Sequence, residues 1–318
     1  MSLASIVRVI GGDLYAGGRC ASVPGPGHGR WDRSVSLLLV GDRVVINTFA
    51  GEDWRQVADQ LRKLGLIGPS GRLLDGQSVA ALPEIERPSP RVRVACARQL
   101  WEDSRPLSGT LSERHCGLRG ADGTRSDALR HHVAVPAAVY RGAGIRRPAL
   151  IAAIQTADGE LCGVEVTYLA PNGERARMAT PRKTVGACPA GAAVRLDPCG
   201  PRMLVGEGVF TTLSAGRRFR RPAWALLSVR NMVRWRPPLG VADVLVAGDR
   251  GAVGEAATEA LVGELKRVGF GAFGRLPPAP FADWNDAVRG EGLEGEEGLG
   301  GVGAADGWSG SPKPEPGV

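Results

Sequence analysis

Apolar residues near the start of the chain follow the patterns of a strand pair and a helix. Two β-rich runs between Ser34 and Phe49 flank the dipeptide Gly41-Asp42, which predicts a β-hairpin. A helix is predicted next, because Asp53 can cap it and apolar residues recur at spacings of three and four at Trp54, Val57, Leu61 and Leu64. These elements predict a small α+β module over residues 1–66.

The next part of the chain changes in character twice. Residues 67–90 are rich in Gly, Pro and Ser and lack apolar periodicity, which is typical of a linker. Residues 91–147 are predicted to be a helical connecting region with two helices. The first presents Val94, Ala97, Leu100 and Trp101 on one face, and the second runs from about Thr110 to Leu118.

From Pro148 the pattern predicts strands. The runs LIAAIQT, LCGVEVTYLA and ERARMAT are separated by Asp158-Gly159 and Asn172-Gly173, so three antiparallel strands are expected to form a meander. Short apolar runs then alternate with helical stretches: MLVGE (203–207), AWALLSV (223–229), DVLVAGD (243–249) and a helix at 255–268. Such runs are typical of strands covered on both faces. The predicted fold class is therefore α/β, a parallel sheet with helices on both faces, over residues 148–290.

Charge is unevenly distributed along the chain. The 318 residues carry a formal charge of +7, but residues 291–318 hold six acids and one base, so this tail carries −5 and the rest +12. The tail lacks apolar periodicity and is expected to be disordered. A basic body favours a polyanionic partner, nucleic acid first, although an arginine-rich composition also follows from a GC-rich genome.

Three further features predict a cytoplasmic protein. No uncharged apolar run approaches the roughly 20 residues of a membrane-spanning helix, so no membrane partner is expected. The first apolar patch contains Arg8 and has no basic residue before it, which is the wrong order for a secretory signal. The six cysteines include no C-x-x-C pair, so we expect reduced thiols rather than a disulfide framework or a zinc knuckle.

Two carboxylates stand at the ends of predicted strands. Glu207 ends the run MLVGE and Asp249 ends DVLVAGD, and open α/β sheets bind ligands at the carboxyl ends of their strands. Mg²⁺ takes one or two carboxylates and completes its shell with water or phosphate oxygens. These acids therefore indicate a magnesium site. The alternative is that each caps the helix that follows it.

Three segments resemble the motifs of a Toprim domain, in the version found in primase-like proteins of phages, plasmids and other mobile elements. They are Val205-Gly206-Glu207-Gly208, the stretch from Val246 to Ala257, and Pro280-Phe281-Ala282-Asp283-Trp284-Asn285-Asp286. Their order and spacing agree with the glutamate, D-x-D-x-x-G and K-D-W/F-N-D motifs of that family. One position departs from the pattern, because the second acid of D-x-D falls on Gly251.

The resemblance implies a chemistry for these residues. Glu207 would act as general acid/base together with Asp249 as the second catalytic residue, and Mg²⁺, or Mn²⁺ in its place, would be held by Glu207, Asp249, Asp283 and Asp286. The implied substrates are nucleotides and single-stranded DNA, in the replication of a mobile or phage-like element.

The N-terminal unit resembles the zinc-binding module of such primases in its strand pair and helix. Three of the four ligand positions, however, read Val23, Thr48 and Glu52, and only His28 remains. One imidazole cannot form a tetrahedral structural site, so we expect a degenerate zinc ribbon without zinc.

Basic and aromatic residues are interleaved in two segments of the Toprim-like region. Arginine neutralises phosphates, and Phe219 and Trp235 offer ring faces, so both segments favour contact with a single strand near the carboxyl edge of the sheet. The alternative is a solvated basic loop with its ring in the core. The predicted nucleic-acid-binding residues are Arg182, Lys183, Arg217, Arg218, Arg220, Arg221, Arg230, Arg234, Trp235 and Arg236.

Two pairs of adjacent residues indicate no site. The side chains of His131 and His132 are expected to point apart, with no carboxylate at ligand spacing. His115 and Cys116 are poorly placed for the hydrogen bond that a nucleophile needs. No G-x-x-x-x-G-K-[ST] sequence occurs, so a replicative helicase would have to be a separate partner protein.

Three functions agree with these observations. The leading interpretation is a primase-related enzyme that performs magnesium-dependent nucleotidyl or phosphoryl transfer on single-stranded DNA. The alternative is a nucleic-acid-binding module that keeps the fold without catalysis, as Gly251 and the missing zinc ligands suggest. A Toprim nuclease agrees less well, because the N-terminal scaffold is primase-like.

Overall fold

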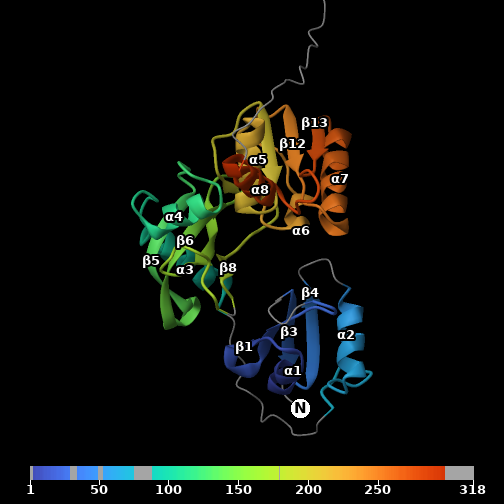
Figure 1. Ribbon diagram of the computed structural model, residues 1–318. Coiled ribbons are helices and arrows are strands. Elements are labelled where there is room, and N and C mark those ends of the chain that lie inside the picture. Colours follow the sequence, from blue (N-terminus) through green and yellow to red (C-terminus); the bar gives the residue numbers. More distant parts are fainter. Residues whose placement is uncertain (1–2, 29–33, 49–52, 75–87, 179, 298–318) are drawn as a thin grey trace, which may run out of the picture.

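Three sheets organise the described part of the chain in the computed structural model (Figure 1). The structure describes residues 3–28, 34–48, 53–74, 88–178 and 180–297, without the side chains of Tyr15, Ala16, Arg141, Ala143 and 291–297. Within these residues no helix is both long and apolar enough to cross a bilayer.

The N-terminal module is a four-stranded antiparallel sheet with a helix at each end of its sequence. Its elements are α1 (Leu3–Ile10), β1 (Asp13–Tyr15), the 3-10 turn η1 (Ala16–Gly18), β2 (Cys20–Val23), β3 (Val35–Val40), β4 (Arg43–Thr48) and α2 (Trp54–Lys63). The predicted hairpin and helix are confirmed. Val40 pairs with Arg43 around the turn, and the Asp53 side chain accepts a hydrogen bond from the Arg55 backbone N–H at 3.0 Å.

The predicted linker begins later than residue 67. Leu66 and Ile67 are buried in the core of the N-terminal module, and Ile67 forms a β-bridge with Leu73. The Val44 backbone N–H also donates to the Gly71 carbonyl at 2.9 Å. Residues 67–74 therefore belong to the module. Most of the remaining expected linker, residues 75–87, lies outside the described residues.

A second unit combines two helices with an antiparallel sheet in the order β5-β6-β7-β8. Its elements are α3 (Pro90–Glu102), α4 (Leu111–Leu118), β5 (Leu129–Ala138), η2 (Val139–Arg141), β6 (Ala143–Gln155), β7 (Leu161–Tyr168) and β8 (Arg182–Gly186). The two predicted helices are confirmed, but residues 129–138 and 143–147 are strand rather than helical connection. The register shifts between His132 and Val135, so the alternation that marks a strand is broken there.

The third strand of the predicted meander is also displaced. The described residues of the run ERARMAT form no strand, and one of them, Arg175, forms a single bridge with Leu169. The third strand of the meander is instead β8, which pairs with β7 and begins at Arg182. The expected turn at Asn172-Gly173 is present, with the Gly173 N–H donating to the Ala170 carbonyl at 2.9 Å.

A mostly parallel sheet with helices on both faces forms the third unit, as predicted. Its order is β13-β12-β10-β11-β9, in which only β9 runs antiparallel. Its elements are β9 (Val194–Arg195), β10 (Arg202–Gly206), α5 (Val209–Phe219), β11 (Ala223–Ala225), α6 (Val229–Met232), β12 (Asp243–Ala247), α7 (Ala252–Arg267), β13 (Gly271–Arg275) and α8 (Trp284–Glu297). Helix α8 therefore continues past residue 291, where the disordered tail was expected to start. The tail from 298 lies outside the described residues.

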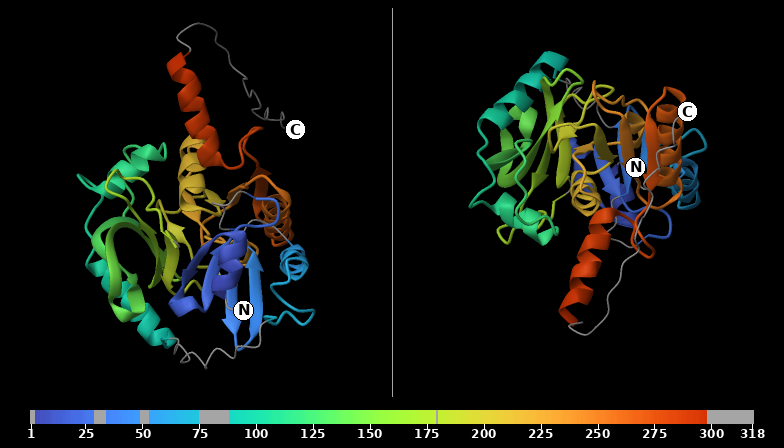
Figure 2. Two further views of the ribbon diagram at one scale, coloured as in Figure 1. Left: turned by 60° about the horizontal axis from the view of Figure 1, so that its bottom comes forward. Right: turned by 90° about the horizontal axis from the view of Figure 1, so that it is seen from above.

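Alternate residues of the central strands supply two separate cores. Val205, Val244 and Val246 pack with residues of α6 and α7, whereas Leu204 and Leu245 pack with Ala215 of α5 and Trp284 of α8. Figure 2 shows the sheet between these helix pairs from two further directions. The period of two along a strand thus explains why these runs read as continuously apolar.

The antiparallel and parallel sheets share a core. Leu150 and Ile154 of β6 belong to the same buried cluster as Val209 and Leu213 of α5. The Gln155 and Ala193 backbones also exchange two hydrogen bonds of 2.9 Å. This contact holds the second unit against the amino-terminal half of α5.

The placement of Trp235 corrects a sequence prediction. Its ring is 1% exposed and packs edge-on against Trp224, with ring centroids 6.5 Å apart. It lies in the core beside α7 and offers no face to a base, so the alternative of a ring in the core is the correct one.

We predict that Trp235→Ala destabilises the protein by about 3 to 5 kcal/mol, because it removes a large buried side chain and leaves a cavity. Denaturant unfolding measures this change. Trp54→Ala is the matched control, since Trp54 is 48% exposed, and it should change stability by about 1 kcal/mol or less. Equal stability of the Trp235 variant and the wild type would contradict the buried position.

Candidate active-site cleft

Parallel pairing of β10 and β12 brings two acids to one edge of the sheet. Gly206 is in register with Ala247 at the carboxyl ends of the strands. Glu207 follows β10 directly, and Asp249 stands two residues beyond β12. The two carboxylates lie close enough for Glu207 to raise the pKa of Asp249. The sequence prediction of neighbouring strand-end acids therefore agrees with the geometry.

The loop that carries Asp249 is shaped for glycine. A Cβ on Gly254 would lie 2.5 Å from the Asp249 carbonyl oxygen, so a larger residue there would displace the acid. Gly251 has a φ of +108°, which L residues rarely adopt. Its N–H donates to Glu255 Oε1 at 3.1 Å. The missing second acid of D-x-D thus coincides with a backbone conformation that disfavours an aspartate.

Two further acids approach from the start of α8. The Asp283 side chain accepts a hydrogen bond from the Asp286 N–H at 2.8 Å and so begins the helix. Arg250 fixes the preceding segment, because its N–H donates to the Ala282 carbonyl at 2.8 Å and its Nε to the Pro277 carbonyl at 2.8 Å. The Asp249 loop and the Asp283 segment are therefore held together through Arg250.

Burial and mutual repulsion perturb this acid cluster. The pKa of Asp249 is raised to about 7, first by burial and then by the charges of Glu207, Asp283 and Asp286. Its Oδ1 atom is buried without a hydrogen-bond partner. Burial also raises the pKa of Glu207, against the opposing effect of Arg182. A carboxylate in such a place is stabilised by a cation.

The cluster agrees with a divalent cation that needs few protein ligands. Among the described residues, no three His, Cys, Asp or Glu side chains form a ready metal cage. Mg²⁺ does not require one, since it is bound through one or two carboxylates with water and phosphate oxygens. The unpartnered Asp249 oxygen, with three other acids acting on it, provides a donor set of this kind.

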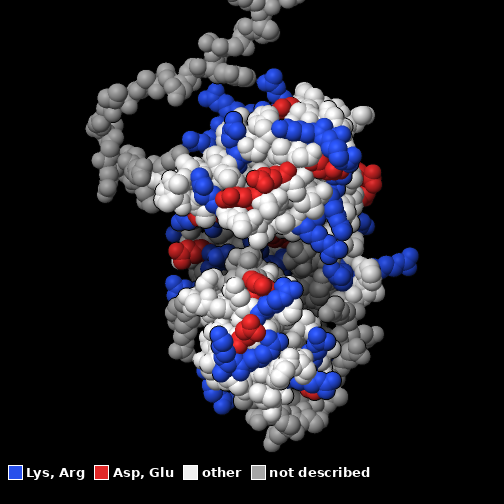
Figure 3. Space-filling view, turned by 90° about the vertical axis from the view of Figure 1, so that its right-hand side faces the viewer, with Lys and Arg blue, Asp and Glu red and all other residues white. Residues whose placement is uncertain are grey.

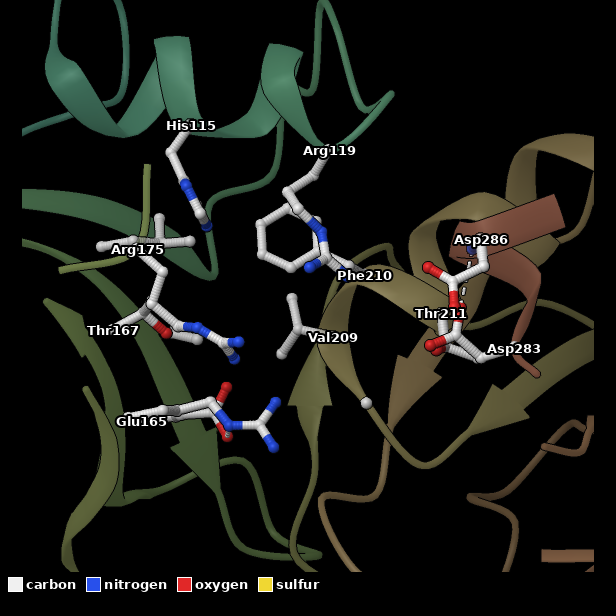
Figure 4. A pocket seen from close by; sticks show the side chains of 14 residues that line it. His115, Arg119, Glu165, Thr167, Arg175, Val209, Phe210, Thr211, Asp283 and Asp286 are labelled. Carbon is white, nitrogen blue, oxygen red and sulfur yellow. Dashed lines mark hydrogen bonds and ion pairs between the residues drawn. The ribbon is translucent and has the colours of Figure 1, made fainter. Parts of the chain in front are cut away.

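A cavity of about 350 Å³ opens between the second unit and the Toprim-like sheet, and Asp283 and Asp286 of the acid cluster line it. Figure 4 shows Asp283 and Asp286 on one wall, with His115, Arg119 and Arg175 on the other. The floor holds Glu165 and Thr167 of β7, and Arg182 Nε lies 3.8 Å from Glu165 Oε2. The cavity thus has an acidic wall and an arginine-rich wall.

A buried amide joins these walls. Asn285 Nδ2 donates to the Arg119 carbonyl and, at 3.1 Å, to Ser214 Oγ. The Asn285 side chain is fully buried, and the Arg119 guanidinium lies 5.1 Å from the centre of the Phe210 ring. This contact fixes the end of α4 against α8, and with it the position of Arg119 opposite the acids.

The alternation of β8 separates two predicted nucleic-acid-binding residues. Arg182 is in register with Thr167 and faces the cavity. Lys183 is in register with Val166 and points to the α3 face, where its Nζ donates to the Ala137 carbonyl at 2.6 Å. Burial lowers the pKa of Lys183 to about 8. Lys183 therefore lies on the other face of β8 from the cavity.

The arginines at the end of α5 lie at the opposite edge of the sheet from the acids. Helix α5 runs back from the carboxyl edge, so its last turn and the residues that follow reach the amino edge. Arg221 pairs there with Asp243, the first residue of β12, and Arg217 donates to the Asp122 carbonyl at 2.6 Å. Arg218 and Arg220 are exposed near them. The expected position near the carboxyl edge is wrong for this segment.

The second basic segment is only partly available to a ligand. Arg230 and Arg234 are exposed, whereas Arg236 pairs with Glu264 at 2.5 Å. Figure 3 shows Lys and Arg side chains interspersed with acids on the side of the molecule that carries α7 and α2. On that side the basic charge is spread out rather than gathered into one patch.

The cavity also contains residues that sequence reasoning missed. His115, Arg119 and Phe210 come from helices far apart in the chain, and Glu165 and Arg175 come from β7 and the turn after it. None stands in a motif. His131, by contrast, is buried and bonded through Nδ1 to Ser112 Oγ at 2.8 Å, which agrees with the structural role expected for it.

Two zinc-ligand positions of the N-terminal module lie within its sheet, and another lies outside the described residues. Val23 is fully buried and pairs with Val35 in the sheet, and Thr48 is the last residue of β4. Glu52 lies outside the described residues. The resemblance of this module to a zinc ribbon remains a prediction.

We predict that Asp249→Asn stabilises the metal-free protein at about pH 8 and has little effect at about pH 4. An acid whose pKa is raised from 3.8 to about 7 costs stability as pH rises through that window, and the cost is complete above it. Three pKa units correspond to about 4 kcal/mol, so after allowance for partial exposure we expect about 2 to 4 kcal/mol.

Thermal unfolding in the presence of a chelator at both pH values measures the effect. The exposed Asp127→Asn serves as the control. A variant no more stable than the wild type at the higher pH would contradict the buried, repelled state of Asp249.

Comparisons with known proteins assign a family to part of this chain. Residues 91–196 match a family described as a domain of unknown function (DUF7146), and residues 202–294 match the family described as Toprim domain. No curated protein sequence matches the chain.

Several solved structures are similar to the chain at low identity. The primase fragment of the bacteriophage T7 primase-helicase protein has 15% identity, a TM-score of 0.38 and coverage of 57% of this chain and 67% of that one. The Aquifex aeolicus primase (zinc binding and RNA polymerase domains) has 13% identity and a TM-score of 0.41, with coverage of 93% of this chain and 81% of that one. The E. coli primase catalytic core has 13% identity and a TM-score of 0.42, with coverage of 65% of this chain and 78% of that one. With TM-scores below 0.5, these similarities establish no activity. The family match and the observed sheet, however, identify residues 202–294 as a Toprim domain.

Proposed function

We propose that the protein is a primase-related nucleotidyltransferase, which joins nucleotides on single-stranded DNA with the help of Mg²⁺ during replication of a mobile or phage-like element. One observation carries this proposal. The unpartnered Asp249 oxygen is under the charge of three other acids, and two of these, Asp283 and Asp286, line a cavity whose opposite wall is rich in arginine. A site of this composition suits a substrate with several phosphates and a divalent cation.

The acid cluster supplies the cation ligands in this proposal. Asp249 and Glu207 would hold Mg²⁺ from the strand ends, with Asp283 and Asp286 contributing from α8. Bound there, Mg²⁺ supplies neutralisation of phosphate oxygens. Gly251 leaves this set one acid short of the family pattern, so we expect weak affinity for the metal.

Proton transfer is the proposed role of Glu207. Burial raises the pKa of its carboxyl group, which favours a group that takes up and releases a proton during the reaction. In bond formation Glu207 would accept the proton of the attacking hydroxyl, and pyrophosphate would leave. Arg119, Arg175 and Arg182 would bind phosphate groups from the opposite wall.

The setting of the reaction follows from the same proposal. In this proposal the protein works on replicating DNA in the cytoplasm, and a helicase partner separates the strands.

We predict that the wild-type protein extends or initiates short chains on single-stranded templates with Mg²⁺ or Mn²⁺, and that Glu207→Gln and Asp249→Asn each lower the rate by about 100-fold or more. Product analysis on denaturing gels measures the rate. Glu259→Gln, on the exposed side of α7, is the matched control and should be unchanged. Metal-dependent cleavage of the template that Glu207→Gln abolishes, without synthesis, would instead identify a nuclease.

A second candidate function is a nucleic-acid-binding module without catalysis. The specific observation in its favour is Gly251, whose backbone conformation disfavours the second acid of the motif. In this case the arginine wall would bind the strand and the acids would be remnants. The two functions share a polyanion site and differ in the need for Glu207.

We predict that both functions give salt-dependent binding to single-stranded DNA through the cavity wall. Combined Arg175→Gln and Arg182→Gln should flatten the plot of log affinity against log salt by about 0.7 per lost phosphate contact. Arg236→Gln is the control, because that side chain is paired with Glu264. Fluorescence anisotropy at several salt concentrations measures the slope. An unchanged slope in the double variant would place the DNA elsewhere on the protein.

A further inference from the structure

One histidine of the cavity is held in a defined orientation. The His115 side chain is 4% exposed, and its Nδ1 lies 2.8 Å from the Gly173 carbonyl oxygen. A carbonyl only accepts, so Nδ1 carries the hydrogen. The ring meets Phe210 edge-on, with centroids 5.3 Å apart. The tautomer and the ring plane of His115 are therefore fixed by the protein.

The other nitrogen of this ring faces the cavity. His115 lines the cavity, and Figure 4 shows the tip of its ring between Arg119 and Arg175. With the hydrogen on Nδ1, Nε2 of the neutral ring carries a lone pair and lies in a region of positive charge. Burial lowers the pKa of His115, and Arg119 and Arg175 lower it further, against the effect of the Gly173 hydrogen bond.

The turn after β7 organises both His115 and its cationic neighbour. Gly173 lies in the turn closed by the Ala170 N–H, which donates to the Glu174 carbonyl at 2.8 Å, and Arg175 follows at once. The turn thus orients the ring of His115 through its carbonyl and carries the guanidinium that faces the same space. This arrangement concentrates donors at one end of the cavity.

Charged residues from five segments of the chain surround His115 in the cavity. Arg119 comes from the end of α4, Arg175 from the turn, Glu165 from β7 and Arg182 from β8, and Asp283 and Asp286 stand across the cavity at the start of α8. Glu165 is the acid nearest Arg182, and its pKa is raised by burial. No salt bridge to Arg119 or Arg175 occurs among the described residues.

We propose that the pocket of His115, Arg119 and Arg175 binds the phosphate groups of the incoming nucleoside triphosphate, and that His115 takes up one proton from solvent as it binds them. The proposal rests on the proposed function for the identity of the ligand. An anion between the two arginines cancels the repulsion that keeps the ring neutral, and protonated Nε2 then donates a hydrogen bond to a phosphate oxygen. Phosphate affinity at this site is thereby linked to pH.

The test follows the imidazole signals of the histidines by NMR in a chelator, with tripolyphosphate as the probe. The chain has four histidines, and His132, buried and outside the cavity, serves as the internal reference. We expect saturating tripolyphosphate to raise the pKa of His115 by about one unit or more and to leave that of His132 unchanged. A His115 signal that does not move at saturation overturns the proposal, and so does the absence of binding.

Two variants separate proton uptake from mere contact. His115→Gln places an amide at the Nε2 position that donates without titrating, so affinity for trimetaphosphate, whose charge is constant between about pH 6 and 8, should lose its pH dependence. In the wild type, one linked proton gives at most about a tenfold rise in affinity per unit fall in pH. His115→Asn keeps a donor to the Gly173 carbonyl and should bind more weakly at the lower pH. Equal pH dependence in all three proteins would overturn the proposal.

The outcome is independent of catalysis. If tripolyphosphate protonates His115 but no nucleotide transfer occurs, the proposed enzyme is wrong and the anion site stands. If transfer occurs while His115 remains neutral with tripolyphosphate bound, the enzyme stands and the proton-linked site is wrong.

Discussion

The apolar contact between the antiparallel sheet and α5 determines what the Toprim domain of this protein faces. Leu150 and Ile154 of β6 are buried with Val209 and Leu213 of α5, so β6 and β7 lie beside the carboxyl edge of the parallel sheet. Without this contact the acids at the strand ends would stand at an open surface. With it, Asp283 and Asp286 of the same acid cluster line a cavity whose other wall comes from a different unit of the chain.

The two walls carry opposite charges, and no salt bridge between described residues joins one wall to the other. Asp249 is buried with like charges around it, while Arg119 is partly buried with an Nε atom that has no partner. Each wall has a cost in free energy that direct contact with the other would relieve. The cavity keeps them apart, and a phosphate-bearing ligand with a cation satisfies both at once.

The Toprim motifs of this chain are preserved at some positions and not at others. The positions that shape the backbone are kept, since Gly254 allows the close approach to Asp249 and Asn285 joins α8 to the end of α4. The position that supplies a second acid is replaced by Gly251, whose φ of +108° suits glycine. The backbone geometry of the motif is thus retained, whereas one of its acids is missing. The catalytic function would require Glu207, and the binding function would not.

The sequence by itself determined the local elements and the strand-end acids. A period of two or of three to four in apolar residues, and turn dipeptides such as Asn172-Gly173, depend on neighbours in the chain, so the helices α2 to α4 and the strands β10, β11 and β12 could be predicted. Tertiary structure alone decided the rest. The bulged strand β5 and the shift of β8 arise from pairing between distant segments, and the burial of Trp235 depends on packing against α7. The opposition of His115, Arg119 and Arg175 to the acids depends on a core shared by two units, and no spacing along the chain encodes such a contact.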